Sequence, residues 1–165
     1  MRIFIDIGHP AHVHYFRNFI RIMTEKGHEF FITARNKDVT HQLLSYYDIP
    51  FISRGIGKNG FVKKLIYLFE ADYQLFKLSK KFNPDLFLSF GSPYAAQTSK
   101  ILNKPHIAFE DTEHAKYSHK MYVPFSDTIL TPDSFIVDFG KKQVYFKGTM
   151  DLCYLNKKYL SLIHI

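Results

Sequence analysis

The chain has 165 residues, 46% apolar and 22% charged, which excludes a disordered segment and is typical of one folded globular domain. Its net charge of +7 suits anionic small molecules, lipid headgroups or nucleic acid without distinguishing among them. The single cysteine, Cys153, excludes an internal disulfide and a cysteine-based zinc site. No apolar run reaches the roughly 18–20 residues that cross a bilayer, so we expect a cytoplasmic protein, with contact to the inner membrane face left open.

Short apolar runs alternate along the chain with longer amphipathic segments. The apolar runs predict strands over residues 3–7, 29–33, 49–52, 85–90, 106–109, 127–130 and 144–146. Apolar residues at helical spacing predict helices over residues 12–26, 38–47, 61–82, 95–102, 115–123 and 150–159. Gly27 is expected to end the first of these helices.

The strands are apolar on both faces, and most are followed by a helix, which predicts a parallel sheet covered on both sides. Right-handed crossovers then give a doubly wound, mostly parallel, Rossmann-like α/β domain. In such a domain, ligands bind in the loops at the carboxyl ends of the strands, near the point where the strand order reverses.

The first strand ends in a loop that carries three histidines, His9, His12 and His14, after Gly8. Gly8 permits close approach of a ligand to the backbone, and the start of the following helix is expected to offer unpaired N–H groups to an anion. The histidines can donate hydrogen bonds to hydroxyl or phosphate groups, or exchange protons near neutral pH. We favour a polar ligand loop over a metal site, because no nearby carboxylate or cysteine completes one. A purely structural role, in which His12 and His14 cap and solvate the helix, remains open.

The fourth strand is followed by Gly91, which leaves space for a ligand, and then by Ser92 and Pro93. This serine and proline are a typical N-cap and first residue of a helix, which by itself explains both. The loop is not a nucleophile elbow, because the Gly-x-Ser-x-Gly pattern is absent.

The fifth strand is followed by three carboxylates and a histidine within five residues, over residues 110–114. A carboxylate at this place can act as a general base toward an acceptor hydroxyl, with His114 as its partner. The alternative is a solvated loop in which Asp111 or Thr112 is the N-cap of the next helix.

Residues 55–60 match the letters of the G-x-G-x-x-G fingerprint, but they follow the third strand and not the first. Asp85 also begins a strand and does not end one, so we expect a flexible loop and no NAD(P) site. Lys58, Lys63 and Lys64 lie among apolar residues, which suits an anionic membrane surface, although a core-facing helix with snorkelling lysines is the favoured interpretation.

Several segments together resemble a prokaryotic family of uncharacterised GT-B-like proteins, known mainly by a domain-of-unknown-function label. They are residues 1–16, Gly27-His28-Glu29, 32–35, Gly91-Ser92, 111–115, Thr131-Pro132, 145–148 and Tyr154-Leu155. The resemblance implies two Rossmann-like domains with a cleft between them, as in glycosyltransferases and UDP-N-acetylglucosamine 2-epimerases. We therefore expect residues 1–148 to form the N-terminal domain and 149–159 the hinge and the start of a second domain. Residues 160–165 lack capping and turn residues, and we expect them to be a non-native tail.

The resemblance implies that the complete protein transfers a sugar from a nucleotide donor to a glycan or lipid-linked acceptor, in envelope or polysaccharide biosynthesis. The N-terminal domain would face the acceptor, and the second domain would hold most of the nucleotide sugar, so the chain alone is expected to be inactive. The expected catalytic residues are Asp111, Glu113 and His9, and the expected substrate-binding residues are Gly8, His12, His14, Gly91, Ser92, Glu110 and His114. No metal or cofactor is expected, since GT-B sites stabilise the leaving diphosphate with protein groups.

Two rival hypotheses remain, a UDP-sugar 2-epimerase-like enzyme and a non-catalytic module that binds a glycan or a polyisoprenyl lipid. The epimerases place a Gly-Asp pair after the fourth strand, where this chain has Ser92. Their glutamate after the fifth strand can match Glu110 or Asp111, but their following Gly-Leu-Arg is missing. This departure weakens the epimerase hypothesis more than the transferase hypothesis. Nucleic acid is not expected as a partner, because only the net charge supports it.

Overall fold

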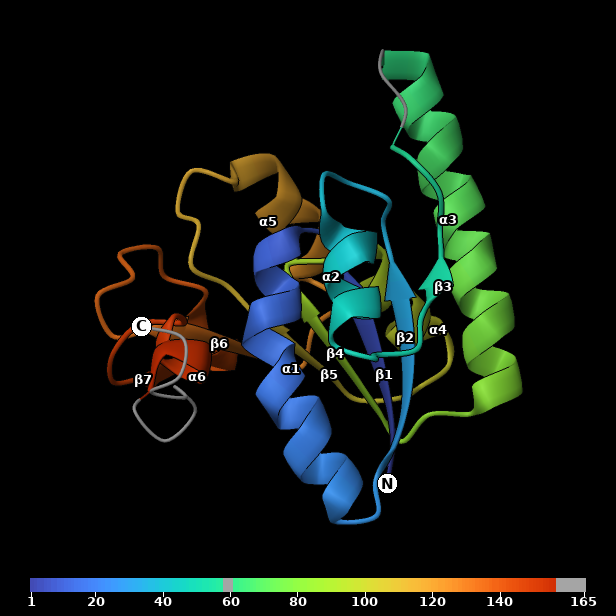
Figure 1. Ribbon diagram of the computed structural model, residues 1–165. Helices are drawn as coiled ribbons and strands as arrows, with labels where there is room; N and C mark the ends of the chain where they lie inside the picture. The colour runs from blue at the N-terminus through green and yellow to red at the C-terminus, as the bar shows by residue number, and fades with distance from the viewer. Residues whose placement is uncertain (58–60, 157–165) are drawn as a thin grey trace.

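The fold is a single parallel sheet of seven strands in the order β3-β2-β1-β4-β5-β6-β7, seen in a computed structural model that describes residues 1–57 and 61–156 (Figure 1). The strands are β1 (Arg2–Ile7), β2 (Glu29–Ala34), β3 (Ile52–Ser53), β4 (Leu86–Phe90), β5 (His106–Phe109), β6 (Thr128–Pro132) and β7 (Gln143–Phe146). Every neighbouring pair is parallel. The predicted doubly wound, Rossmann-like domain is confirmed.

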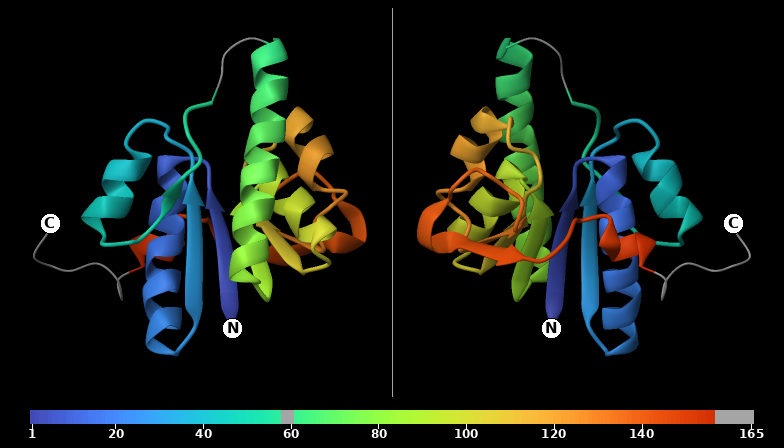
Figure 2. Two further views of the ribbon diagram at one scale, coloured as in Figure 1. Left: turned by 90° about the vertical axis from the view of Figure 1, so that its right-hand side faces the viewer. Right: turned by 90° about the vertical axis from the view of Figure 1, so that its left-hand side faces the viewer.

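Helices cover both faces of the sheet. They are α1 (Pro10–Glu25), α2 (Thr40–Tyr46), α3 (Phe61–Phe82), α4 (Pro93–Ile101), α5 (Lys116–Tyr122) and α6 (Leu152–Leu155). Figure 2 shows α1, α2 and α6 on one face, and α3, α4 and α5 on the other. Within the described residues, no helix combines the length and the apolar character needed to cross a bilayer.

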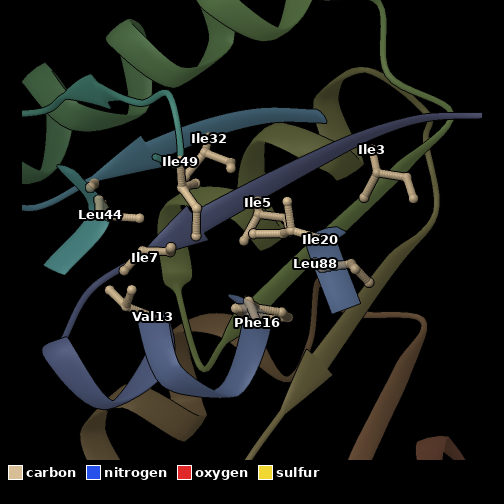
Figure 3. Packing of buried hydrophobic residues seen from close by; sticks show 11 residues of the cluster. Ile3, Ile5, Ile7, Val13, Phe16, Ile20, Ile32, Leu44, Ile49 and Leu88 are labelled. Carbon is tan, nitrogen blue, oxygen red and sulfur yellow. The ribbon is translucent and has the colours of Figure 1, made fainter. Parts of the chain in front are cut away.

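The side chains on the two faces of β1 pack into two separate parts of the core. Ile3, Ile5 and Ile7 pack toward α1, where they join Phe16 and other buried side chains (Figure 3). Phe4 points the opposite way, into a cluster with Leu75 of α3 and Phe87 of β4. This alternation follows from the two-residue repeat of a strand, and both sets are almost fully buried. Burial on both faces fixes β1 at the centre of the sheet, so the loop that follows it lies at a fixed place.

The strand order reverses between β1 and β4, because β2 and β3 extend the sheet on one side of β1 and β4 to β7 on the other. The loops after these two strands therefore meet at the edge where doubly wound domains bind their ligands. They carry Gly8 and His9 after β1, and Gly91 and Ser92 after β4. The sequence prediction thus placed the candidate loops at the correct edge of the sheet.

The ends of several elements differ from prediction for identifiable reasons. Strand β3 was predicted over residues 49–52 but is Ile52–Ser53. Ile49 is still bonded to α2 through its N–H to the carbonyl of Leu44, with Asp48 at φ 52°, and Pro50 has no N–H to donate. The chain is therefore free to pair with β2 only from Ile52 onward.

Gly27 ends α1 as predicted, at φ 81°, directly after the C-cap residue Lys26. Its N–H donates to the carbonyl of Thr24, and the N–H of His28 donates to that of Met23, which is a complete Schellman motif.

The last predicted helix is seen as α6 over its described part, and α6 packs beside α1. The expected tail at 160–165 and the end of the expected hinge lie outside the described residues. The same holds for Lys58 and for the side chains of Lys63 and Lys64.

Candidate functional site

A buried carboxylate at the end of β1 organises the carboxyl edge of the sheet. Asp6 is fully buried and accepts three side-chain hydrogen bonds from three other segments. Thr33 Oγ1 of β2 donates to Oδ1 at 2.8 Å, and Arg54 Nε, just after β3, donates to the same oxygen at 2.8 Å. Ser92 Oγ donates to Oδ2 at 2.5 Å. Asp6 therefore ties the loops after β1, β3 and β4 to one point.

Arg54 is only 5% exposed, although it is a cation at the surface end of a strand. Its Nη1 donates to the hydroxyl of Tyr67 at 3.0 Å, and its guanidinium lies 4.7 Å from the centre of the Tyr94 ring. Sequence reasoning missed Asp6 and Arg54. The signal was present, because a charged residue inside the apolar run of β1 needs a buried partner of opposite charge.

A second carboxyl, Asp72 of α3, lies within electrostatic reach of this pair. Burial, with a smaller effect from the charge of Asp6, raises its pKa to about 6, while Arg54 acts in the opposite direction. Its Oδ1 is buried and has no hydrogen-bond partner among the described residues. Asp72 is therefore the member of the cluster whose charge changes near neutral pH.

The histidine loop differs from expectation in how it uses its backbone N–H groups. His9 is the N-cap of α1, and its Nδ1 accepts the N–H of Ala11 at 3.3 Å. The N–H of His12 donates to the carbonyl of His9, and Pro10 has none, so the first turn of α1 does not offer the unpaired N–H groups that were predicted. The predicted capping role belongs to His9, and not to His12 or His14.

His12 is held by two contacts at the start of α1. Its Nδ1 accepts the N–H of Gly8 at 3.3 Å, and its ring stacks on Phe90 with 4.7 Å between ring centres. Burial, with smaller electrostatic effects from His9, Lys37 and Arg54, lowers the pKa of His12 to about 3. The ring is therefore neutral at physiological pH, with its hydrogen on Nε2, and acts as a donor but not as a base.

His14 lies on a different side of α1. Its Nδ1 and the hydroxyl of Tyr47 form a hydrogen bond of 3.4 Å, and its ring is 5.4 Å from that of Tyr154 in α6. The structure thus places His14 at the contact between α1, α2 and α6. Within the described residues, no group of three or more histidine, cysteine or acidic side chains is arranged to hold a metal ion.

The loop after β4 combines a helix cap with a link to Asp6. Ser92 is the N-cap of α4, as predicted, with its Oγ accepting the N–H of Ala95 at 3.4 Å. The same hydroxyl donates to Asp6, so Ser92 has both roles at once. Gly91 has φ 49°, and a Cβ there would lie 2.9 Å from Oε2 of Glu110. Only glycine fits this turn without moving the carboxylate.

Glu110 lies buried beneath the acidic loop and holds it in shape. Its Oε1 accepts the N–H groups of Asp111 at 3.1 Å and Thr112 at 2.9 Å. Its Oε2 accepts the hydroxyl of Tyr122 at 2.8 Å and lies 3.3 Å from Nε2 of His119. Burial raises the pKa of Glu110, and the bonds from Tyr122 and Thr112 oppose this effect. Both carboxylate oxygens of Glu110 therefore already accept hydrogen bonds, from its own loop and from Tyr122.

The exposed acid of this loop is Asp111, with Glu113 half-buried and His114 exposed. Neither Asp111 nor Thr112 is the N-cap of α5, because that helix begins after Ala115 without a side-chain cap. The alternative of a capping loop is therefore wrong. The physical reason is that both residues lie before the N-cap position of α5, which is Ala115, in a loop held by the carboxylate of Glu110.

Phe90, at the end of β4, packs against rings from the start of α1. His12 stacks on one part of its ring, and Tyr15 of α1 lies 4.8 Å from its centre. Burial, followed by the charge of Asp111, raises the pKa of Tyr15. Asp111 therefore lies within electrostatic reach of Tyr15, whose phenol ring packs on Phe90 as the neutral His12 ring does.

A buried histidine supports the β4 loop from below. His106 of β5 accepts a hydrogen bond at Nε2 from Ser89 Oγ and donates one from Nδ1 to Ser126 Oγ, each 2.9 Å long. The direction is fixed because Ser126 Oγ donates onward to the carbonyl of Tyr122. Ser89 Oγ in turn accepts the N–H of Ser92, so the chain reaches the candidate site. Burial lowers the pKa of His106 to about 4.

Sequence comparison shows the family of the chain. Residues 1–164 match the family described as "Protein of unknown function (DUF354)". The chain belongs to this family. An uncharacterized protein of Methanocaldococcus jannaschii is 28% identical over an alignment of 163 residues, and the alignment covers 94% of this chain and 47% of that protein. The chain thus spans about half the length of the curated relative that it matches.

Solved structures show the same fold for this member of the family. Their sequence identities to the chain are so low that the comparison establishes the fold alone. The S. aureus MnaA–UDP structure has a TM-score of 0.71 at 12% identity, over 98% of this chain and 50% of that chain. MurG of Acinetobacter baumannii has a TM-score of 0.68 at 13% identity, over 90% and 46%. The UDP-GlcNAc 2-epimerase of Methanocaldococcus jannaschii has a TM-score of 0.67 at 14% identity, over 82% and 40%. The chain corresponds to one half of these GT-B-like structures.

Proposed function

We propose that this chain is the acceptor-side half of a sugar-transferring protein of GT-B architecture, which takes its nucleotide sugar mainly on a second domain. The acceptor would be a glycan or a lipid-linked molecule of envelope or polysaccharide biosynthesis. The observation that carries the proposal is the packing of His12 and Tyr15 on Phe90, at the reversal of strand order, with the exposed carboxylate of Asp111 after the next strand, β5. The likeness to a solved glycosyltransferase and to a UDP-GlcNAc 2-epimerase supports it at the level of the fold.

In this proposal Asp111 is the general base for the acceptor hydroxyl. It is exposed and its Oδ1 accepts one short-range bond, from Thr112 Oγ1 at 3.1 Å, so a carboxylate oxygen remains for substrate. Glu113 is the alternative base, with His114 beside it. His9 and His12 serve as donors to the acceptor, and Gly91 and Ser92 shape the floor of the site. His14 contributes through the packing of α1 against α2 and α6 and not through contact with substrate.

The test uses a longer version of the protein that includes the second half found in its relatives. Transfer from UDP-, GDP- and CMP-sugars to extracted lipid and glycan acceptors is measured with the longer protein and with the 165-residue chain. We expect transfer by the longer protein only. Asp111→Asn should lower kcat about 10²–10⁴-fold, the usual contribution of a general base, whereas Asp133→Asn, an exposed control, should leave it unchanged.

The epimerase alternative has one specific observation in its favour, the buried Glu110 with its raised pKa directly beside Gly91. Conversion of a UDP-sugar by the longer protein without any acceptor, abolished by Glu110→Gln in a folded variant, would establish this alternative and reject sugar transfer. Saturable glycan or lipid binding with no turnover of any nucleotide sugar would instead indicate a non-catalytic module. Transfer by the chain alone would contradict the assignment of the donor site to a second domain.

A further inference from the structure

The imidazole rings of His9 and His12 have the same unusual arrangement at the start of α1. In each ring Nδ1 accepts a backbone N–H, from Ala11 for His9 and from Gly8 for His12, both at 3.3 Å. A neutral ring that accepts at Nδ1 carries its hydrogen on Nε2. In each histidine, the bond at Nδ1 uses up a backbone N–H donor, and the Nε2–H group of the ring is available as a donor in its place. Among the described residues, neither Nε2–H group has a hydrogen-bond acceptor.

Arg54 adds a third donor at the same place. Its Nε and Nη1 are bonded to Asp6 and Tyr67, while no acceptor for Nη2 is found in the described part of the chain. A Cβ on Gly8 would lie 3.7 Å from Nη2 and 3.8 Å from Cε1 of His12. Nη2 and the His12 ring therefore approach Gly8 together, and the missing side chain leaves the space between them open.

We infer that the Nε2–H groups of His9 and His12, together with Nη2 of Arg54, bind a phosphate group carried by the substrate. All three groups are donors, and none is an acceptor, which selects a ligand rich in acceptor oxygens. The two rings are 5.9 Å apart between centres. Since N–H···O bonds to an anion are about 2.8 Å long, one tetrahedral anion can bridge rings at this spacing.

The charged groups around the site nearly cancel one another, so the choice of ligand depends on these three hydrogen-bond donors. Lys37 acts on both rings and Arg54 on His12, where they lower the pKa after the larger effect of burial, and Asp38 opposes this effect at His9. Arg54 is itself paired with Asp6. The two cations and two carboxylates balance, so oriented N–H groups, and not a general positive field, would hold the phosphate. The inference rests on the proposed function only for the identity of the molecule that carries the phosphate.

The test is an NMR titration of the ¹⁵N-labelled 165-residue protein with methyl phosphate, observing the imidazole nitrogens. We expect the Nε2–H tautomer for His9 and His12 in the free protein, and saturable shifts of both rings on titration. Gly8→Ala should weaken binding about tenfold, because its methyl group fits the fold but fills the space between Arg54 and His12. His9→Asn should weaken it similarly, because asparagine keeps the helix cap and removes the Nε2 donor. Lys26→Gln, at the far end of α1, removes a charge as a control and should change nothing.

Competition distinguishes the two sources of a phosphate. Displacement of methyl phosphate by UDP but not by uridine would confirm the site and assign it to the donor diphosphate. Displacement by a short prenyl phosphate but not by UDP would confirm it and assign it to the acceptor. The absence of any saturable shift at His9 and His12 would overturn the inference. Binding by Gly8→Ala and His9→Asn as tight as that of the unsubstituted protein would also overturn it. Sugar transfer by the longer protein together with that result would leave the proposed function intact.

Discussion

Tyr122 donates a 2.8 Å hydrogen bond to Oε2 of Glu110, and this oxygen lies directly beside Gly91. The contact joins α5 to the end of β5 and leaves no room for a side chain on the loop after β4. The same carboxylate therefore accepts the backbone N–H groups of the acidic loop and limits the space at Gly91 of the β4 loop.

Substitution of Gly91 should show this crowding. Gly91→Ala places a Cβ 2.9 Å from Glu110 and 3.2 Å from Tyr122, in addition to the cost of φ 49°. Gly27→Ala is a matched control, because Gly27 also has a positive φ, 81°, but nothing within 4 Å of its Cβ position. We expect a loss of about 1 kcal/mol of unfolding free energy for Gly27→Ala and about 2–4 kcal/mol for Gly91→Ala, measured by urea unfolding. Equal losses would show that the carboxylate moves aside freely.

Removal of Arg54 should expose the cost of the buried Asp6 charge. Arg54→Ala leaves Asp6 buried without a cation, and we expect it to lose about 3–5 kcal/mol of unfolding free energy. Arg21→Ala breaks an exposed pair with Glu25 and should cost no more than about 1 kcal/mol. Chemical denaturation at pH 7 measures both. A loss for Arg54→Ala as small as that for Arg21→Ala would mean that water reaches Asp6.

Asp72 should make the protein less stable as the pH rises toward neutrality. Its pKa is raised from 3.8 to about 6, so the folded state binds the proton more tightly than the unfolded state does. The stabilisation is complete below about pH 4 and is lost as the pH rises through 6. Asp72→Asn should therefore gain about 1 kcal/mol at pH 7.5, a value reduced because solvent reaches part of the carboxyl group, and nothing at pH 4. Unfolding curves at both pH values, with Asp133→Asn as the exposed control, test this; a gain of equal size at both would contradict it.

His106 should have the opposite effect on the acid side. Its pKa is lowered from 6.5 to about 4, so the unfolded state takes up the proton first as the pH falls. Stability is retained above pH 6.5 and decreases by about 3 kcal/mol as the pH falls to 4. His106→Gln keeps a donor and an acceptor but cannot titrate, so its unfolding free energy should depend less on pH in this range. The slopes of unfolding free energy against pH for the two proteins provide the measurement, and identical slopes would assign the titration to other groups.

The parallel sheet, its covering by helices on both faces and the edge that carries the candidate loops could be predicted, because apolar runs on both faces and alternating helices leave few topologies. The cap formed by Ser92 and the helix end at Gly27 could also be predicted, since both depend on residues next to one another in sequence. The part that could not be predicted is the environment of each acid. Glu110 and Asp111 are neighbours with the same charge, yet one lies beneath the loop and the other in solvent.

The same limit explains why Asp6 and Arg54 were missed. Asp6 and Arg54 are 48 positions apart, and the local sequence around either residue does not indicate which residue is its partner. Asp6 inside an apolar strand was the available signal, and it indicated only that a partner must exist. The split among the histidines, with His9 and His12 at the β1 loop and His14 beside Tyr47 and Tyr154, depends in the same way on packing.

The spacing of the Asp6 contacts along the chain has a consequence for folding kinetics. Its partners are 27, 48 and 86 residues away, so each hydrogen bond needs a long loop to be closed first. We expect the central strands to be in place at the rate-limiting step and these contacts to form after it. Substitutions at Asp6 would then speed unfolding and leave the folding rate nearly unchanged. The hydrogen bonds of Asp6 would thus determine the unfolding rate of the protein, and the pairing of the apolar strands its folding rate.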